Sequence, residues 1–194
     1  MDKRHTLIRD ARVFFDFGWL LGTSGNLSFR TGGQFTITRS GAHKGELTDA
    51  DFVRCAVDDA RPLEDKKPSA ETAIHALIYR TFPSVGAVYH VHQVHAAICG
   101  RIDGDKTTFQ GWEMIKGLGF WEENVAVDVP IVENHADIPT LTDAIESVLD
   151  RCEVPGVNIA GHGIYAWGET PFDARRHIET FGYLFEAQYL LNRN

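Results

Sequence analysis

Two histidines one residue apart close the apolar stretch Val85-Gly86-Ala87-Val88-Tyr89-His90-Val91-His92. Because alternate side chains of a β-strand point to the same face, both imidazoles are expected on one side of a sheet, with Cα atoms about 6–7 Å apart. Nitrogens at that separation can both reach one Zn²⁺, and a third histidine would leave the fourth tetrahedral position open for water or a substrate. The alternative for a bare His-x-His pair is two unrelated histidines, each hydrogen-bonded at a strand end.

The third ligand has four candidates among the other histidines, namely His75, His95, His135 and His162. His162 is flanked by glycines, where the backbone can approach a ligand closely. His95 comes three residues after the pair and could join it only if the chain turns sharply. His75 is expected as a hydrogen-bonded residue on a helix, and His135 and His177 are expected to face solvent. The spacing alone leaves His95 and His162 as alternatives.

Helical and strand patterns alternate along the rest of the chain. Apolar residues at helical spacing predict helices over residues 7–18, 69–82, 138–149 and from 171 onward, with Ser69 and Thr170 as N-caps of the second and the last. Short apolar runs predict strands over 26–29, 34–38, 52–57, 125–132, 157–160 and 164–167 besides the histidine strand, the first two forming a hairpin. These patterns predict one three-layer α/β/α domain with a mixed sheet over residues 1–194.

Length and charge limit the classes of function. A chain of 194 residues can bury a large core without disulfides or a structural metal, so a bound metal is expected to be functional. A formal net charge of −8, with no stretch rich in Lys or Arg, argues against nucleic-acid and membrane partners. The N-terminus has no signal-peptide or transmembrane pattern, and the three cysteines lack metal-binding spacing. We therefore expect a cytoplasmic protein with free thiols.

Three loops rich in small polar residues lie at 22–26, 38–45 and 67–69. Backbone N–H groups, hydroxyls and the positive end of a helix can together surround a phosphate, and Ser69 is expected to open a helix. Each loop taken singly is typical of an ordinary turn. When the three loops are considered together with Lys44, a phosphate site and three unrelated turns are equally good interpretations.

Four motifs, in order along the chain, resemble those of the class II aldolase/adducin-like family: Thr23-Ser24-Gly25-Asn26-Leu27-Ser28, Ser69-Ala70-Glu71, His90-Val91-His92 and Gly161-His162-Gly163. The resemblance covers nearly the whole chain and implies a central sheet that is mixed and largely antiparallel. It also implies that His90, His92 and His162 hold one divalent metal per subunit, usually zinc. It further implies that the loops bind the phosphate of a sugar phosphate, with Lys44 beside the contacting residues Asn26, Ser40, Gly41 and Ser69.

Within that family, residues 40–45, 113–117 and 162–170 resemble the methylthioribulose-1-phosphate dehydratases. In those enzymes the glutamate of the Glu-Met-x-Lys-Gly stretch is the general acid and base, which implies that role for Glu113. Glu71 is expected beside the substrate, because the aldolases use the glutamate at this motif position for proton transfer whereas some dehydratases carry a cysteine there. The implied reaction is the dehydration of 5-methylthioribulose 1-phosphate in methionine salvage.

Two other functions fit the same residues. One is a zinc-dependent aldolase or epimerase acting on fuculose or ribulose phosphate. The other is a non-enzymatic interaction module similar to the adducin head, which would have no use for three histidines and two suitably placed glutamates.

The last predicted helix has an apolar face wider than one core contact needs. Part of that face is therefore expected to meet another subunit. The family resemblance adds a fourfold assembly in which neighbouring chains wall the metal cleft. We expect a closed homo-oligomer, a tetramer, because closed symmetry is how identical subunits usually bury such a surface.

Overall fold

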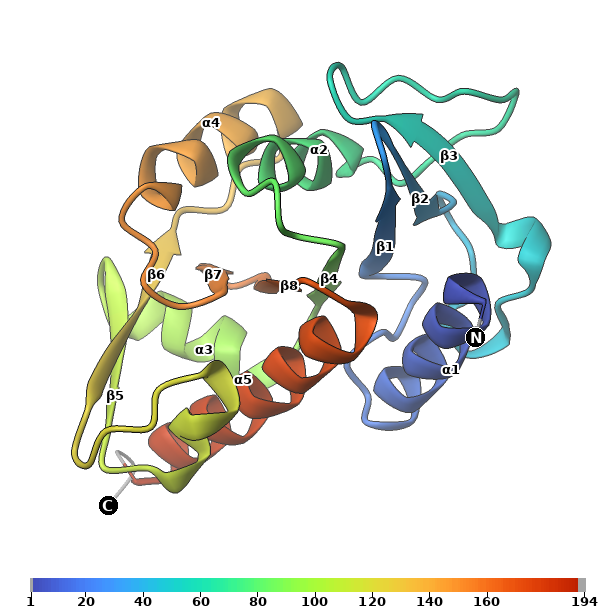
Figure 1. Ribbon diagram of the computed structural model, residues 1–194. Coiled ribbons are helices and arrows are strands. Elements are labelled where there is room, and N and C mark those ends of the chain that lie inside the picture. The colour runs from blue at the N-terminus through green and yellow to red at the C-terminus, as the bar shows by residue number, and fades with distance from the viewer. Residues whose placement is uncertain (1, 192–194) are drawn as a thin grey trace.

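An open, mixed β-sheet runs through the middle of the molecule (Figure 1). The computed structural model describes residues 2–191. Within these residues the strands follow the spatial order β3-β2-β1-β4-β8-β7-β6-β5, and only the β6–β7 pair is parallel. The strand bounds are β1 Asn26–Thr31, β2 Gln34–Thr38, β3 Phe52–Ala56, β4 Ala87–Val91, β5 Lys106–Gln110, β6 Ala126–Val132, β7 Gly156–Ile159 and β8 Gly163–Gly168. The prediction of a mixed, largely antiparallel sheet is confirmed.

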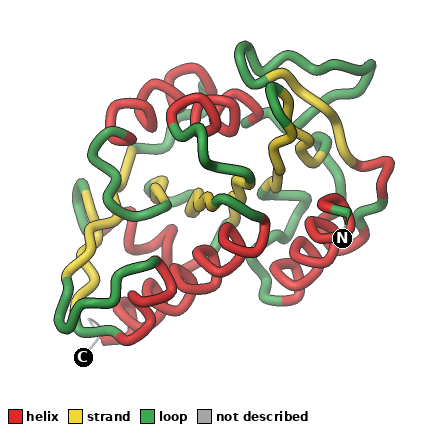
Figure 2. The backbone as a smooth tube through the Cα atoms, viewed as in Figure 1, coloured by secondary structure: helices red, strands yellow, loops and turns green. Residues whose placement is uncertain are grey.

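Helices cover both faces of this sheet (Figures 1 and 2). One face carries α1 (Lys3–Asp16), α3 (Val94–Ile102) and α5 (Pro171–Leu191), and the other carries α2 (Thr72–Thr81) and α4 (Ile138–Leu149). Each face has its own apolar core: Tyr89 of β4 packs into the core with α1 and α5, and its neighbour Val88 packs into the core with α2 and α4. The predicted three-layer α/β/α arrangement is confirmed.

Two elements, α3 and β5, lie where the sequence patterns predict none. Helix α3 contains Gly100, which is unfavourable inside a helix but needed here, because a Cβ at this position would lie 2.9 Å from the Cα of Ala160. Strand β5 has only five residues, in which buried Thr107 and Phe109 alternate with exposed neighbours. Both signals are too short to stand out from a loop in the sequence.

Helix α2 begins three residues later than the predicted N-cap at Ser69, and its N-cap position is Glu71. The backbone N–H of Ser69 donates to the carbonyl of Thr38 at 3.2 Å, which holds this segment beside the end of β2. The Thr72 hydroxyl in turn donates to the Ser69 carbonyl at 2.5 Å. The prediction that Ser69 opens the helix is therefore wrong, because its backbone continues the pairing with β2.

Helix α5 begins as predicted, with the Thr170 hydroxyl accepting a hydrogen bond from the backbone N–H of Asp173 at 3.2 Å. Phe181 and Phe185 are buried against the sheet, whereas Leu190 and Leu191 are 52% and 60% exposed. Part of the apolar face is thus uncovered in the single chain, and its burial by another subunit stays a prediction. Across residues 2–191, no helix has both the length and the apolar composition that crossing a bilayer requires.

Candidate metal centre

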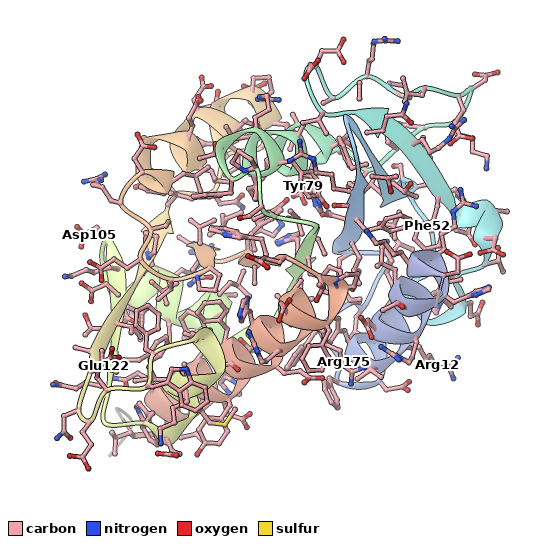
Figure 3. All side chains as sticks on the ribbon, viewed as in Figure 1. Arg12, Phe52, Tyr79, Asp105, Glu122 and Arg175 are labelled. Atoms are coloured by element: carbon pink, nitrogen blue, oxygen red, sulfur yellow. The ribbon has the colours of Figure 1, made fainter. Side chains whose placement is uncertain are left out.

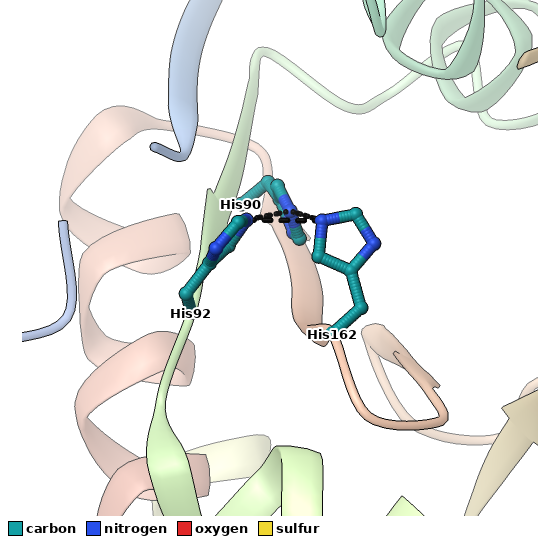
Figure 4. Close-up of side chains that lie close together, drawn as sticks. All are labelled: His90, His92 and His162. Carbon is teal, nitrogen blue, oxygen red and sulfur yellow. Dashed lines mark hydrogen bonds between the residues drawn. The ribbon is translucent and has the colours of Figure 1, made fainter. Parts of the chain in front are cut away.

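Three histidines converge at the carboxyl end of β4 (Figure 4). His90 lies within β4, His92 follows just after its last residue, and His162 lies in the turn between β7 and β8. The Nε2 atom of His92 is 3.0 Å from the Nε2 atoms of both His90 and His162, and the latter two are 3.3 Å apart. His90 and His92 point the same way, as the strand spacing predicts, and the structure brings His162 to them.

Close packing of the β7–β8 turn explains the position of His162. Gly161 has a φ of +67°, a conformation that residues with a side chain rarely adopt. On the other side of His162, a Cβ at Gly163 would lie only 2.2 Å from the carbonyl oxygen of Val91. The two glycines therefore let the turn press against the end of β4, where His162 meets the histidine pair.

The protonation of the rings fits a cation at this point. The Nδ1 of His90 donates to the carbonyl of Ile164 at 3.1 Å, and the Nδ1 of His162 donates to the Oδ1 of Asn134 at 3.2 Å. Burial lowers the pKa of His90 well below its ordinary 6.5. Burial, and secondly the proximity of His162, lowers the pKa of His92 to about 4. His90 and His92 are therefore neutral at neutral pH.

With its proton on Nδ1, the neutral His90 ring directs the lone pair of Nε2 into the space between the three rings, 3.3 Å from the Nε2 of His162. A cation placed there would be coordinated by that lone pair. Imidazole nitrogens suit zinc and several other divalent transition metals, and three protein ligands leave one position open in a tetrahedral site. The histidine centre therefore fits a divalent metal of the catalytic kind.

A carboxylate stands beside the histidines. Glu71, at the start of α2, has its Oε2 3.6 Å from the Nε2 of His90 and its Oε1 3.5 Å from the Nε2 of His162. The Tyr165 hydroxyl and the Asn26 amide nitrogen each donate to Oε2 at 2.7 Å. Burial by itself would raise the pKa of Glu71, but a protonated His90 and the hydrogen bonds from Tyr165 and Asn26 outweigh it and lower the pKa to about 2. At neutral pH, where His90 is neutral, the two hydrogen bonds favour the ionised form. Glu71 is thus an ionised carboxylate facing the centre.

The three polar loops lie next to one another. The buried Lys44 donates from Nζ to the carbonyls of Thr23 and Ala42, each at 2.9 Å, which ties the loop at 22–26 to the loop at 38–45. The backbone N–H of Ser40 donates to the Lys67 carbonyl at 3.1 Å, which ties the second loop to the third. Burial, and secondly the charge of Arg39, lowers the pKa of Lys44 to about 8. The loops therefore form one polar surface.

The predicted phosphate contacts differ in exposure within this surface. Gly41 is exposed and Ser40 and Ser69 are partly exposed, so a ligand can reach them. Asn26 is buried, and its amide is hydrogen-bonded to Glu71 and to His75. Phosphate binding by these residues and by Lys44 stays a prediction.

Glu113 lies elsewhere in the fold. It begins the 3₁₀ segment Glu113–Leu118, its side chain is 82% exposed, and it forms an ion pair with Lys116 at 2.6 Å. It lines a cleft with Trp112 and Glu122, and Figure 3 shows Glu122 at the edge of the molecule. Among the described residues that line this cleft there is no histidine. The single chain therefore does not bring Glu113 to the histidine centre.

One histidine prediction is corrected, the open alternative of His95 is decided, and two site residues were missed. His177 is buried, not solvent-facing, because its Nδ1 donates to the carbonyl of Trp167 at 2.7 Å. His95 stands in α3 with its ring 5.2 Å from that of Tyr189, so it takes no part in the centre. The residues missed are Asn134 and Tyr165. Asn134 has no sequence signal, because it reaches His162 from a segment 28 residues away. Tyr165 lies in the stretch 162–170 that the sequence analysis singled out, but nothing in the sequence shows that its hydroxyl meets Glu71, 94 residues away.

An open mixed sheet between two helical layers, with three histidines converging beside one strand end, suits a metal-dependent enzyme. Residues 5–189 match the family described as "Class II Aldolase and Adducin N-terminal domain". The chain belongs to this family.

Within this family, the chain is similar to proteins named methylthioribulose-1-phosphate dehydratase. The chain is 42% identical over 191 residues to methylthioribulose-1-phosphate dehydratase of Microcystis aeruginosa, covering 95% of this chain and 93% of the relative. It is 42% identical over 179 residues to the dehydratase of the same name from Geobacillus kaustophilus, covering 88% and 83%. Among solved structures, L-fuculose-1-phosphate aldolase from Thermus thermophilus superposes with a TM-score of 0.80 at 22% identity, covering 97% of this chain and 93% of the aldolase. The last likeness supports the fold alone.

Proposed function

We propose that this chain is a zinc-dependent methylthioribulose-1-phosphate dehydratase of methionine salvage. It would convert 5-methylthioribulose 1-phosphate into 2,3-diketo-5-methylthiopentyl 1-phosphate and water. The observation that carries the proposal is the 42% identity to a dehydratase of that name along 93% of its length, in a chain whose fold assembles the three histidines into one centre. The free cysteines suit a cytoplasmic enzyme.

The roles of the residues follow from their positions. His90, His92 and His162 would hold the metal through Nε2. When bound, a divalent metal supplies positive charge that polarises a ketone and acidifies the adjacent C–H bond. The polar loops carry hydroxyls and backbone N–H groups suited to the phosphate of the substrate. Glu71, ionised and beside the histidines, would accept hydrogen bonds from the substrate hydroxyls or take up a proton.

Elimination requires that the proton of C3 be taken up and that the hydroxyl leaving C4 be protonated, after which the enol becomes the diketone. One carboxyl group can do both in turn. We assign this role to Glu113, which would act first as the general base at C3 and then as the general acid for the leaving hydroxyl. Since Glu113 and the histidines of one chain line different parts of the surface, Glu113 would have to come from a second copy of the chain. We therefore propose a homotetramer of single-domain subunits, with the active sites at subunit boundaries.

One observation favours a second candidate, a class II aldolase or epimerase. Glu71 is the carboxylate that a single chain places at the histidine centre, at 3.5 and 3.6 Å from two of the rings. A proton transfer by Glu71 would suit cleavage of a carbon–carbon bond or epimerisation. The position of the base relative to the substrate separates these reactions.

In the test, the purified protein is incubated separately with methylthioribulose 1-phosphate, ribulose 1-phosphate and fuculose 1-phosphate. Loss of water and release of aldehyde are measured for each compound. Diketone from the first compound supports the dehydratase, and aldehyde from the others would support the aldolase. Glu113→Gln is expected to keep metal and substrate binding and to lower the dehydration rate by about 10²–10⁴-fold. Near-normal turnover in Glu113→Gln with collapse in Glu71→Gln would transfer the catalytic role to Glu71. A protein without stoichiometric metal would instead favour an interaction module.

A further inference from the structure

A chain of buried hydrogen bonds leads away from Glu71 into the core between α2 and β1. Strand β1 sends Asn26 and Ser28, two residues apart, to the face that α2 covers. Helix α2 presents His75 and Tyr79, four residues apart, to the same space, and Figure 3 shows Tyr79 between the helix and the strand. Together with Glu71 these are the residues of the relay described below.

The contacts of the relay are short and continuous. The Asn26 amide contacts Glu71 through Nδ2 and His75 Nε2 through Oδ1. The other ring nitrogen of His75, Nδ1, is 2.7 Å from the Ser28 hydroxyl, which is 2.7 Å from the Tyr79 hydroxyl. His75, Ser28 and Tyr79 have no exposed surface. Buried polar groups of this kind need partners of matching donor and acceptor character.

The direction of the hydrogen bonds follows from the Asn26 amide. Its Nδ2 donates to Oε2 of Glu71 at 2.7 Å, and its Oδ1, which can only accept, faces Nε2 of His75. His75 must then donate from Nε2, which leaves Nδ1 as an acceptor for the Ser28 hydroxyl. Burial lowers the pKa of His75 to about 3, so the ring is neutral and has one proton to place. The hydroxyl of Tyr79 completes the relay by donating to Ser28.

We propose that His75 is a positioning residue, which fixes the orientation of the Glu71 carboxylate at the histidine centre through the Asn26 amide. The relay acts together with Tyr165, whose hydroxyl donates to the same oxygen, Oε2, at 2.7 Å. Two donors on Oε2 hold that oxygen, and the other oxygen, Oε1, stands 3.5 Å from the Nε2 of His162. A His75 that donated from Nδ1 instead would leave two acceptors, its own Nε2 and the Asn26 oxygen, facing each other.

The functional part of this inference rests on the proposed function, since it assumes that Glu71 serves the reaction. Its structural part does not, because the tautomer of His75 can be observed directly. Long-range ¹H–¹⁵N NMR of histidine-labelled protein is expected to show His75 protonated at Nε2 and bare at Nδ1 throughout the neutral pH range. The resonances of His75 are identified as those that are missing from the spectrum of the His75→Gln variant. A proton on Nδ1 would overturn the relay, whatever the variants do.

Two variants separate positioning from packing. His75→Gln places an amide N–H near the former Nε2 and is expected to keep kcat close to that of the wild type. His75→Asn is too short to reach Asn26, and is expected to lower kcat by about 10²-fold with little change in KM, because a small misplacement of a group beside the reacting atoms costs about that much. Rates are expressed per folded, metal-loaded protein. His177→Gln is the matched control, a buried histidine outside the relay, and its kcat should be unchanged.

Equal kcat values for His75→Gln and His75→Asn, per loaded protein, would overturn the positioning role. If the wild-type protein dehydrates none of the substrates while His75 is protonated at Nε2, the proposed function fails and the relay stands as the support of Glu71.

Discussion

His75 is expected to make the folded protein sensitive to acid, because it is buried without a charge. Burial lowers its pKa from 6.5 to about 3 in the folded state, and the unfolded chain restores the ordinary value. Between these two values the unfolded state binds a proton that the folded state does not bind. The free energy of unfolding therefore falls as the pH falls through 6.5 toward 3, and this loss is absent above pH 6.5.

The expected size of the effect follows from this difference in proton binding. A pH of about 5 is about one and a half units below the pKa of His75 in the unfolded chain. At about 1.4 kcal/mol per unit, the free energy of unfolding is therefore expected to fall by about 2 kcal/mol. The carboxylate of Glu71 acts in another range. Its pKa is lowered from 4.5 to about 2, so its contribution is present above pH 4.5 and is lost only below that value. The window between about pH 7 and pH 5 therefore reports on histidines.

The assay is urea unfolding of wild type and His75→Gln at about pH 7 and about pH 5, with a chelator present so that metal release does not contribute. The wild type is expected to lose about 2 kcal/mol more than the variant on acidification, because glutamine does not titrate. His5→Gln, at a histidine with a side chain 64% exposed, is the control and should behave as the wild type does. Equal losses in wild type and His75→Gln would refute the assignment of His75 as a neutral, buried base.

Three further predictions concern the metal and the core. With metal at a thousand times its dissociation constant, chelation should remove about 4 kcal/mol and lower Tm by about 8–16 °C in scanning calorimetry. His162→Ala should abolish stoichiometric zinc in elemental analysis whereas His95→Ala should keep it, and the reverse pattern would move the third ligand to His95. Asp10→Ala should cost about 3 kcal/mol in urea unfolding, because Asp10 is fully buried and bonded to Tyr89 and Arg175. Asp16→Ala, which breaks an exposed pair on the same helix, should cost less than about 1 kcal/mol, and equal costs would contradict the argument.

Local periodicity accounts for the parts of the fold that the sequence predicted well. The hairpin of β1 and β2 and the helix α4 follow from turn residues and apolar spacing within a few residues, and their predicted bounds lie close to the observed ones. The same periodicity places His90 and His92 on one side of the chain, since two residues are one repeat of a strand. These features depend on neighbours in sequence, so the sequence is sufficient to find them.

Long-range backbone pairing explains the errors in other segments. Ser69 has the composition of an N-cap, but its backbone N–H bonds to Thr38 of β2 and the helix begins later. His177 lies among polar residues in the sequence, yet the fold turns its ring toward the carbonyl of Trp167. In both cases the deciding partner is a backbone group of another element, and spacing within the segment carries no information about it.

The sequence by itself determined the alternation of helices and strands, the pair His90 and His92, and the motifs that indicate the family. Spacing left His95 and His162 open as the third histidine, the family resemblance implied His162, and the tertiary structure brings His162 to the pair. Only the tertiary structure decided that Asn26, His75 and Glu71 form one relay. Only the tertiary structure, again, placed Glu113 in a separate cleft of the same chain. The physical reason is that strand order and helix packing set which distant side chains meet, and these depend on the burial of the whole apolar core and on backbone pairing across the sheet.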